Sequence, residues 1–317
     1  MLEVRLGSYR RALGEVLVEL GRELRDLVVL DADTPKSTGS IAFAEAFPER
    51  FINVGISEQD LVSMAAGLAI GGKVPVATAF AAFLMRAWEQ VRNTVARMGL
   101  NVKLVGTHAG LSAHLDGASH QVLEDIALMR ALPNTTVIAP ADAEAVKELI
   151  RQAVTEVRGP TYVRLGRDNA IPVYRRGEVR NLRVGHVNVI EDSEDAVIFA
   201  HGPMVGVALA AARILKHSEG LSVGVVDAHT IQPLDTDAVV KLAKRANLAV
   251  TLEEHRPVGG LGSAVAEVLT SSKVSTPLLR LGAGKAFGAS ARSYWDLLRY
   301  AGLSPEEVAR RVGGALT

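Results

Sequence analysis

Residues 51–92 read FINVGISEQDLVSMAAGLAIGGKVPVATAFAAFLMRAWEQVR, and this stretch decides the fold. Its apolar pattern predicts a strand, a helix, a second strand and a second helix, in that order, at Phe51–Val54, Ser57–Ile70, Val74–Thr78 and about Ala82–Met98. Helices that connect fully apolar strands are typical of crossover connections, which join parallel strands in a sheet covered on both faces. The stretch therefore indicates an α/β protein with a mainly parallel sheet.

The same alternation continues on both sides of this stretch. Before it, a helical pattern with Ser8 as its cap places five apolar residues on one face: Tyr9, Leu13, Val16, Leu20 and Leu24. Strands and one longer helix are predicted at Leu27–Leu30, Val102–Thr107, Thr135–Ala139, Ala143–Val157 and Thr161–Leu165. A polar loop is expected from His108 to His120.

The pattern lapses at IPVYRRGEVRNLR, residues 171–183, a charged stretch typical of a linker. The alternation then restarts, with strands and helices predicted at Ala196–Ala200, Val205–Lys216, Ser222–Val226, Thr236–Arg245, Leu248–Glu253, Leu261–Thr270 and Leu278–Leu281, and two terminal helices at Ser290–Leu298 and Pro305–Val312. We therefore expect two doubly wound, mainly parallel-sheet domains, at residues 1–172 and 189–317, with a linker at residues 173–188.

The composition excludes several classes of protein. Lys+Arg and Asp+Glu both number 35, so no formal net charge attracts nucleic acid or an anionic membrane over long distances. Without cysteine the chain has no disulfide, no thiolate metal site and no cysteine nucleophile. Because no segment has about 18 uninterrupted apolar residues, we expect a soluble, cytoplasmic protein.

Residues that could carry chemistry lie where predicted strands end. Glu58 falls in the first turn of a predicted helix, just after a strand, and open α/β sheets bind ligands at the carboxyl ends of strands. A first-turn acidic residue also interacts favourably with the helix dipole, so its position alone leaves both interpretations open. Phe80 and Phe83 stand three apart in a chain with only 4% aromatic residues, and they could form a flat wall for a heteroaromatic ring.

The stretch GISEQDLVSMAAGLAIGG followed by AFAAFLMRAWEQVR resembles the pyrimidine-binding domain of transketolase, a thiamine-diphosphate enzyme. Further segments resemble that family in the same order: SYRRALGEVL, LDADTPKST, THAGLSAHLDGASHQVLEDIALMRALPNTTVIAPAD, VRLGRDNAI, VDAHTIQPLD and LEEHRPVGGLG. They are spread over essentially all 317 residues. The resemblance therefore implies a pyrimidine-binding domain followed by the transketolase carboxyl-terminal domain.

Full-length transketolases carry a further domain before this region, whose Gly-Asp-Gly and downstream Asn hold a divalent ion and the cofactor's diphosphate. The only Asp-Gly pair in this chain is Asp116-Gly117, preceded by Leu115. The resemblance thus implies one subunit of a split transketolase, with a separate amino-terminal subunit that holds Mg²⁺ or Ca²⁺, and an α2β2 assembly. We also expect the isolated chain to dimerise and to bind thiamine diphosphate poorly.

The resemblance implies roles for the residues at the cofactor. Glu58 matches the carboxyl that hydrogen-bonds N1′ of the aminopyrimidine and so turns the cofactor's own 4′-amino group into a base. Phe80 and Phe83 match the rings that flank the pyrimidine, Asp33 matches a position near the cofactor, and Arg86 is a further candidate. The implied reaction is the reversible transfer of a two-carbon ketol unit from a ketose phosphate to an aldose phosphate.

Two further groups match substrate-binding positions of the family. One contacts sugar hydroxyls, the aldehyde oxygen or the bound intermediate, with the histidines as proton carriers: His108, Asp116 and His120. The other grips the sugar phosphate: Arg10, Ser37 and Arg167. Arg164 is a weaker match and His114 has no implied role. Residues 259–262, Gly-Gly-Leu-Gly, lack the full dinucleotide-binding spacing and indicate a turn before a helix.

Two alternatives remain open. The glutamate and the order of domains are shared by β subunits of 2-oxo acid dehydrogenases and by deoxyxylulose-phosphate synthases. The segments LDGASH at 115–120 and LDADTPKST at 30–38 favour transketolase over both. A non-catalytic binding subunit is the other alternative, and the presence of Glu58 together with both phenylalanines and the phosphate-gripping residues argues against it.

Overall fold

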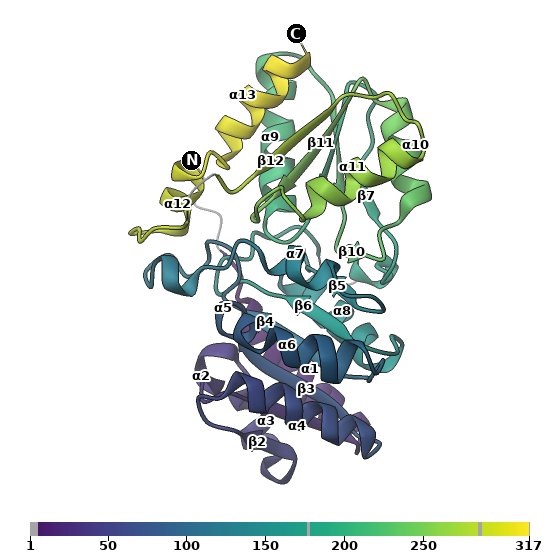
Figure 1. Ribbon diagram of the computed structural model, residues 1–317. Coiled ribbons are helices and arrows are strands. Elements are labelled where there is room, and N and C mark those ends of the chain that lie inside the picture. The colour runs from purple at the N-terminus through teal and green to yellow at the C-terminus, as the bar shows by residue number, and fades with distance from the viewer. Residues whose placement is uncertain (1–5, 176–177, 285–286, 317) are drawn as a thin grey trace.

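The computed structural model describes residues 6–175, 178–284 and 287–316, which form two α/β domains (Figure 1). The first part of the chain contains α1 (Tyr9–Glu23), β1 (Leu27–Asp31), α2 (Pro35–Thr38), α3 (Ile41–Ala46), η1 (Pro48–Arg50), β2 (Phe51–Asn53), α4 (Glu58–Ile70), β3 (Val74–Phe80), α5 (Ala81–Leu84), η2 (Met85–Ala87), α6 (Trp88–Gln90), η3 (Val91–Ala96), β4 (Lys103–Thr107), η4 (Ala118–His120), α7 (Asp125–Arg130), β5 (Thr136–Ile138), α8 (Ala143–Thr155), β6 (Thr161–Arg164) and η5 (Glu178–Asn181). The second part contains β7 (Asn188–Glu191), β8 (Ala196–Ala200), α9 (Met204–Ser218), β9 (Val223–Asp227), β10 (Thr230–Gln232), α10 (Thr236–Arg245), β11 (Leu248–Glu253), α11 (Leu261–Ser271), β12 (Leu278–Gly282), α12 (Tyr294–Tyr300) and α13 (Pro305–Leu316).

The first sheet has the strand order β10-β5-β6-β4-β3-β1-β2, and all its pairs are parallel except β10 with β5. Strand β1 shows why such a sheet forms, because all five of its residues are buried. Leu27 and Val29 pack with residues of α1 and α8, whereas Val28 and Leu30 pack with residues of α4 on the opposite face. Successive side chains of a strand alternate between faces, so one apolar run supports two cores.

The second sheet has the order β12-β11-β8-β9-β7, in which only the edge strand β7 is antiparallel to its neighbour. Residues of α9 and α13 cover one of its faces, and residues of α10 and α11 cover the other (Figure 1). Two mainly parallel sheets, each layered between helices, confirm the predicted α/β class.

The prediction of one regular helix at about Ala82–Met98 was wrong. It is divided into α5, η2, α6 and the π-helical η3. The buried residues Ala81, Leu84 and Ala87 follow one another at steps of three, whereas Val91 and Val95 follow at steps of four. Steps of three and four keep residues on one face of a helix, so the segment has a single buried face through all its changes of helix type.

The two domains are joined by more than the linker. Strand β10 comes from the second part of the chain, yet it pairs antiparallel with β5 at the edge of the first sheet. The linker also packs, because Val179 and Leu182 are buried in the core formed with α1 and α8. Strand β10 was not predicted, since Ile231 is its only apolar residue and an edge strand of three residues leaves almost no pattern.

Candidate active site

Predicted site residues gather at the carboxyl edge of the first sheet. Because β1, β2, β3, β4 and β6 run parallel, the segments that leave them emerge at one edge. These segments carry Asp33 after β1, Glu58 after β2, Phe80 at the end of β3, His108 after β4 and Arg167 after β6. The topology therefore brings together residues that lie far apart in the sequence, from Asp33 to Arg167.

Glu58 is a largely buried residue whose carboxyl group has no partner within the described chain. Glu58 begins α4 and is only 5% exposed, whereas its neighbour Ile56 is 80% exposed. Its carboxylate makes no hydrogen bond or ion pair with the described residues, and its oxygens are not among the unpartnered atoms that are sealed from solvent. A carboxylate that reaches the surface and has no partner in its own chain is free to accept hydrogen bonds, so Glu58 fits a group that comes from outside this chain.

Asp31 holds the loop after β1. The sequence motifs did not predict a role for this residue. Its fully buried carboxylate accepts hydrogen bonds from three hydroxyl groups at 2.7–2.9 Å: Thr38, Ser40 and Thr78. Asp33 follows with a left-handed φ of 65° and accepts a hydrogen bond from Asn53 Nδ2 at 2.9 Å. The available signal was an aspartate at the end of an apolar strand with several Ser and Thr after it, a pattern typical of side-chain-to-backbone turns.

Four aromatic rings line one side of this edge. Phe80 and Phe83 stack with ring centroids 5.2 Å apart and planes within 5°. His108 stacks on Phe80 at 3.7 Å, and His120 meets Phe83 edge-on at 5.2 Å. The two phenylalanines therefore lie together at this edge, in one group of rings with two imidazoles.

The loop from His108 to His120, predicted to be polar, is partly buried. Residues 108–113 are all buried, and only the part from His114 onward reaches solvent. Burial, reinforced by the charges of Arg167 and Arg10, lowers the pKa of His108 to about 3. Its Nδ1 lies 3.0 Å from the Thr107 hydroxyl. His108 is therefore a neutral imidazole near pH 7, with one nitrogen that donates a hydrogen bond and one that accepts.

This pKa predicts that His108 keeps its neutral form over a wide pH range. In the isolated chain labelled with ¹⁵N-histidine, NMR should show a neutral His108 imidazole from pH 8 down to about pH 4, because an unperturbed histidine titrates near 6.5. His108→Gln assigns the signal, and free histidine in the sample provides the reference titration. Protonation of the assigned signal at pH 6 would contradict the burial of this ring.

The arginines predicted to grip a phosphate lie together and are paired with carboxylates of the chain. Arg10 donates from Nε and Nη2 to the two carboxylate oxygens of Asp168, at 3.0 and 2.5 Å. Arg167 donates to Asp116 at 3.4 Å and lies 3.9 Å from Asp168. Asp168 was not predicted, because its pairing with Arg10 depends on a contact between α1 and the loop after β6. With both carboxylates counted, this group of four residues carries no net charge.

Ser37 lies in α2, whose position relative to Arg10 is set by Gly39. A Cβ on Gly39 would lie 2.1 Å from the Arg10 carbonyl oxygen, and Gly39 has a φ of 93°, so only glycine allows this close approach. Arg86 is exposed in η2, one turn beyond Phe83, and no described contact joins it to the other site residues. His114 is half-buried, with Nδ1 3.3 Å from the Ser112 carbonyl oxygen.

Arg164, the weaker substrate candidate, has a structural position instead. It is 4% exposed, and its Nε donates to Asp125 at 2.9 Å. Tyr162 donates its hydroxyl hydrogen to the same carboxylate at 2.7 Å. An ion pair sealed from solvent in this way holds α7 against β6 and offers no charge to a ligand.

The described residues contain no group of three or more His, Asp or Glu side chains arranged to hold a metal ion. Among the described helices, none combines the length and the hydropathy needed to cross a bilayer.

Comparisons with known families agree with this geometry. The family described as transketolase, pyrimidine binding domain, matches residues 7–172, and the family described as transketolase, C-terminal domain, matches residues 185–308. A protein of Methanocaldococcus jannaschii named as a transketolase C-terminal section is 46% identical over 96% of this chain and 94% of its own length. This chain therefore belongs to the transketolase family and consists of its pyrimidine-binding and C-terminal domains.

This chain covers different shares of the length of two other relatives. A 6-deoxy-6-sulfo-D-fructose transketolase subunit of a Clostridium species is 34% identical over 97% of this chain and 95% of its own length. The 1-deoxy-D-xylulose-5-phosphate synthase of Thermomicrobium roseum is 36% identical over 96% of this chain, which spans only 48% of that enzyme.

Solved structures agree with both domains. A structure described as a split gene transketolase in an inactive β4 tetramer matches with a TM-score of 0.87 and 43% identity, over 98% of each chain. The transketolase of Leishmania mexicana matches with a TM-score of 0.82 and 26% identity, over 98% of this chain and 46% of its own.

Proposed function

We propose that this chain is one subunit of a split, thiamine-diphosphate-dependent transketolase and that the assembled enzyme transfers a two-carbon ketol unit between sugar phosphates. The observation that carries the proposal is the carboxyl group of the largely buried Glu58, which has no partner among the described residues and shares a sheet edge with the Phe80–Phe83 stack. A carboxyl group and a flat apolar surface are what an aminopyrimidine ring requires of its site.

We assign each residue at this edge of the first sheet a role that fits its surroundings. When bound, thiamine diphosphate supplies the carbon nucleophile, at C2 of its thiazolium ring. Glu58 holds a proton between its carboxyl group and N1′ of the aminopyrimidine, and Phe80 and Phe83 pack against that ring. His108, neutral near pH 7, can donate a hydrogen bond to a substrate oxygen, and His120 is placed at the other end of the same aromatic surface.

The sugar phosphate would bind at Arg10 and Arg167. Guanidinium groups suit phosphate oxygens because they offer paired N–H donors in one plane. In this chain those donors already contact Asp168 and Asp116, so a phosphate exchanges internal carboxylate contacts for its own. Ser37, in the helix that packs beside Arg10, adds a hydroxyl donor.

We further propose that a separate amino-terminal subunit provides the diphosphate-binding domain and its Mg²⁺ or Ca²⁺, in an α2β2 assembly. This chain covers nearly all of a transketolase C-terminal section but less than half of an undivided transketolase. The description of the similar split-gene transketolase as an inactive β4 tetramer supports the idea that such chains self-associate and need a partner for activity.

The second candidate function is that of a deoxyxylulose-phosphate synthase half. The specific observation in its favour is the 36% identity to such synthases across 96% of this chain. The histidine-rich loop at residues 108–120 and the Arg10–Arg167 group favour ketol transfer between two sugar phosphates.

Assay of the reconstituted pair separates the two functions. The subunit encoded beside this one, or the amino-terminal half of a related split transketolase, is mixed with this chain, thiamine diphosphate and Mg²⁺. We expect ketol transfer from xylulose 5-phosphate to ribose 5-phosphate to exceed any turnover of pyruvate. Equal or greater turnover of pyruvate would replace the proposal with the synthase or 2-oxo acid dehydrogenase function.

The isolated chain should bind thiamine diphosphate weakly. Its described residues offer Glu58 and an aromatic wall to one ring of the cofactor but no metal cluster for the diphosphate. Isothermal titration calorimetry should show weak binding by this chain alone and much tighter, Mg²⁺-dependent binding once the partner is added. Tight Mg²⁺-dependent binding by the chain alone contradicts the division of the site between two subunits.

Arg10→Ala should raise the KM for a phosphorylated ketose about 10- to 100-fold, since a hydrogen bond to a charged group contributes about 1.5–3 kcal/mol. The change in kcat should be smaller, because the phosphate does not react. Arg11→Ala is the matched control, since Arg11 is the adjacent arginine and pairs with Glu15 on the helix surface. An equal rise in KM for a non-phosphorylated ketose would show that Arg10 does not recognise the phosphate.

A further inference from the structure

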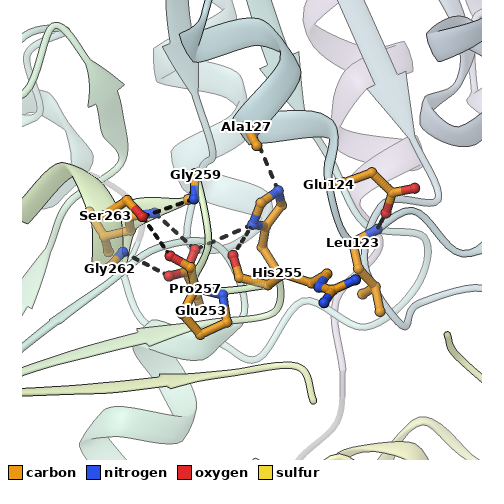
Figure 2. Close-up of polar contacts among 12 residues, drawn as sticks. Leu123, Glu124, Ala127, Glu253, His255, Pro257, Gly259, Gly262 and Ser263 are labelled. Atoms are coloured by element: carbon orange, nitrogen blue, oxygen red, sulfur yellow. Dashed lines mark hydrogen bonds and ion pairs between the residues drawn. The ribbon is translucent and has the colours of Figure 1, made fainter. Parts of the chain in front are cut away.

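Three consecutive buried residues end β11 and extend beyond it: Glu253, Glu254 and His255. Glu253 is turned toward its own domain. Its two carboxylate oxygens accept hydrogen bonds from the backbone N–H groups of Leu261 and Gly262, at 2.9 and 2.8 Å, where α11 begins (Figure 2). The glycine-rich segment is therefore a turn before a helix, as predicted, and Glu253 serves as its anchor within the second domain.

His255 joins the second domain to the first. Its Nε2 accepts a hydrogen bond from the backbone N–H of Ala127 in α7, at 3.4 Å (Figure 2). The next residue, Arg256, donates its backbone N–H to the Leu123 carbonyl at 2.9 Å. The end of β11 is thus attached at two points to the segment that follows the histidine loop.

Glu254 lies against the histidine loop itself. One of its carboxylate oxygens accepts a hydrogen bond from the backbone N–H of Leu111 at 2.8 Å. A Cβ on Gly110 would lie 2.5 Å from the same carboxyl group, and Gly110 has a φ of 65°. Both the space and the backbone conformation therefore require glycine at 110, directly beside a carboxylate from the other domain.

Further hydrogen bonds complete a cluster formed by Gly110, Leu111, Val122, Arg164 and Glu254. Gly110 donates its N–H to the Val122 carbonyl at 3.0 Å. Arg164 donates from Nη2 to the Glu254 carbonyl at 2.9 Å and to the Val122 carbonyl at 3.4 Å. The loop, the end of β11 and β6 are therefore joined by hydrogen bonds that are shielded from water.

The turn that this cluster holds contains His108 in an unfavourable conformation. His108 has a φ of 57°, and Gly110, two residues later, has a φ of 65°. A non-glycine residue is uncommon in the left-handed region, so contacts with its surroundings help to keep it there. The Leu111–Glu254 hydrogen bond fixes the far end of this turn, while the stack on Phe80 holds the imidazole ring.

We propose that Glu254 is a positioning residue, through which the C-terminal domain holds the turn from His108 to Leu111 and keeps the imidazole stacked on Phe80. The proposal rests on the proposed function in one respect, that His108 contacts the substrate. It assigns the C-terminal domain a direct effect on an active site built on the other domain.

Either protonation state of Glu254 offers an oxygen to the Leu111 amide. Burial raises the pKa of Glu254 to about 7, and the nearby Arg164 opposes this rise. A neutral acceptor of the same shape should therefore substitute for it, so Glu254→Gln is the conservative variant and Glu254→Ala is the disruptive one.

The first test measures the turn without partner, cofactor or substrate. Hydrogen–deuterium exchange of the isolated chain, followed in peptides that cover residues 107–115, should be about tenfold faster or more in Glu254→Ala and close to wild type in Glu254→Gln. Glu253→Ala is the matched control, because it removes the adjacent buried carboxylate, whose contacts among the described residues are with α11 and the neighbouring histidines. Unchanged exchange in Glu254→Ala, or equally fast exchange in Glu253→Ala, would overturn the proposal.

The second test measures catalysis by the reconstituted pair. Glu254→Ala should lower kcat about 10- to 100-fold with little change in the KM for the ketose, because a displaced imidazole affects the reaction more than binding. Gly110→Ala should have a similar effect, and combining it with Glu254→Ala should recover part of the loss, since the carboxyl group that the new methyl meets is gone. Strictly additive losses would refute the contact.

The two tests separate this proposal from the proposed function. If wild type shows no ketol transfer while the exchange results hold, the reaction was wrongly assigned and the positioning of the turn stands. If ketol transfer is present but hydrogen exchange in the turn is unchanged in Glu254→Ala, only the positioning role of Glu254 is refuted.

Discussion

Glu58→Gln should lower ketol transfer by the reconstituted pair about 10²- to 10⁴-fold, the range typical of a lost acid–base group. A glutamine amide can donate a hydrogen bond to a ring nitrogen, but it cannot exchange the proton that a carboxyl group shares with that nitrogen. The substitution barely alters size, and Glu58 has no hydrogen bond within the described chain to lose. The variant should therefore fold normally and bind its partner, with the loss seen in kcat.

Asp60→Asn is the matched control for this prediction. Asp60 is exposed in the same first turn of α4, so the control removes an equal charge from the same helix end. If Glu58 acts only through the helix dipole, both variants should behave alike, with small changes in stability and none in rate. Full activity of Glu58→Gln would support the alternative of a subunit that keeps the fold without taking part in the chemistry.

Asp125→Ala should lower the free energy of unfolding of the isolated chain by about 3–5 kcal/mol, because it leaves a buried guanidinium without its carboxylate. Arg164 and Asp125 are 4% and 0% exposed, and Tyr162 loses its hydrogen-bond acceptor in the same variant. Urea unfolding followed by circular dichroism measures the change, with the transition moving to lower urea concentration.

Asp26→Ala is the control for this second prediction. Asp26 forms an ion pair with Lys73 at 2.7 Å, but both side chains are largely exposed. Solvent and salt screen such pairs, so the urea midpoint should hardly move. A similar shift of the urea midpoint in both variants would mean that burial does not increase the contribution of the Arg164–Asp125 ion pair to the free energy of unfolding.

The class of fold could be predicted from the sequence because parallel strands leave a strong pattern. The run Leu27–Leu30 is apolar at every position and is buried on both faces of the sheet. The helix Thr236–Arg245 was predicted with the bounds that the structure has, since Asp235 caps it and two basic residues end it. Strands β7 and β10 lie at sheet edges, where alternation is short and weak, and neither was predicted.

The candidate site was predictable only in part. Glu58 and His108 each follow a strand and Phe80 ends one, so strand prediction and the family resemblance together locate them at one edge. The roles of Asp168 and Glu254 could not be predicted from the sequence. Asp168 contacts Arg10 and Glu254 contacts Leu111, and these pairs are separated by 158 and 143 residues. No local pattern records such contacts.

The sequence by itself determined which segments become strands and helices, which family the chain resembles, and which residue types stand at the carboxyl ends of the strands, because these depend on local periodicity and local motifs. Only the tertiary structure decided that residues 108–113 of the histidine loop are buried, that the arginines are paired with carboxylates, and that the second domain contacts the turn at His108. Burial and pairing arise when distant segments exclude water from one another, and that exclusion exists only in the folded chain.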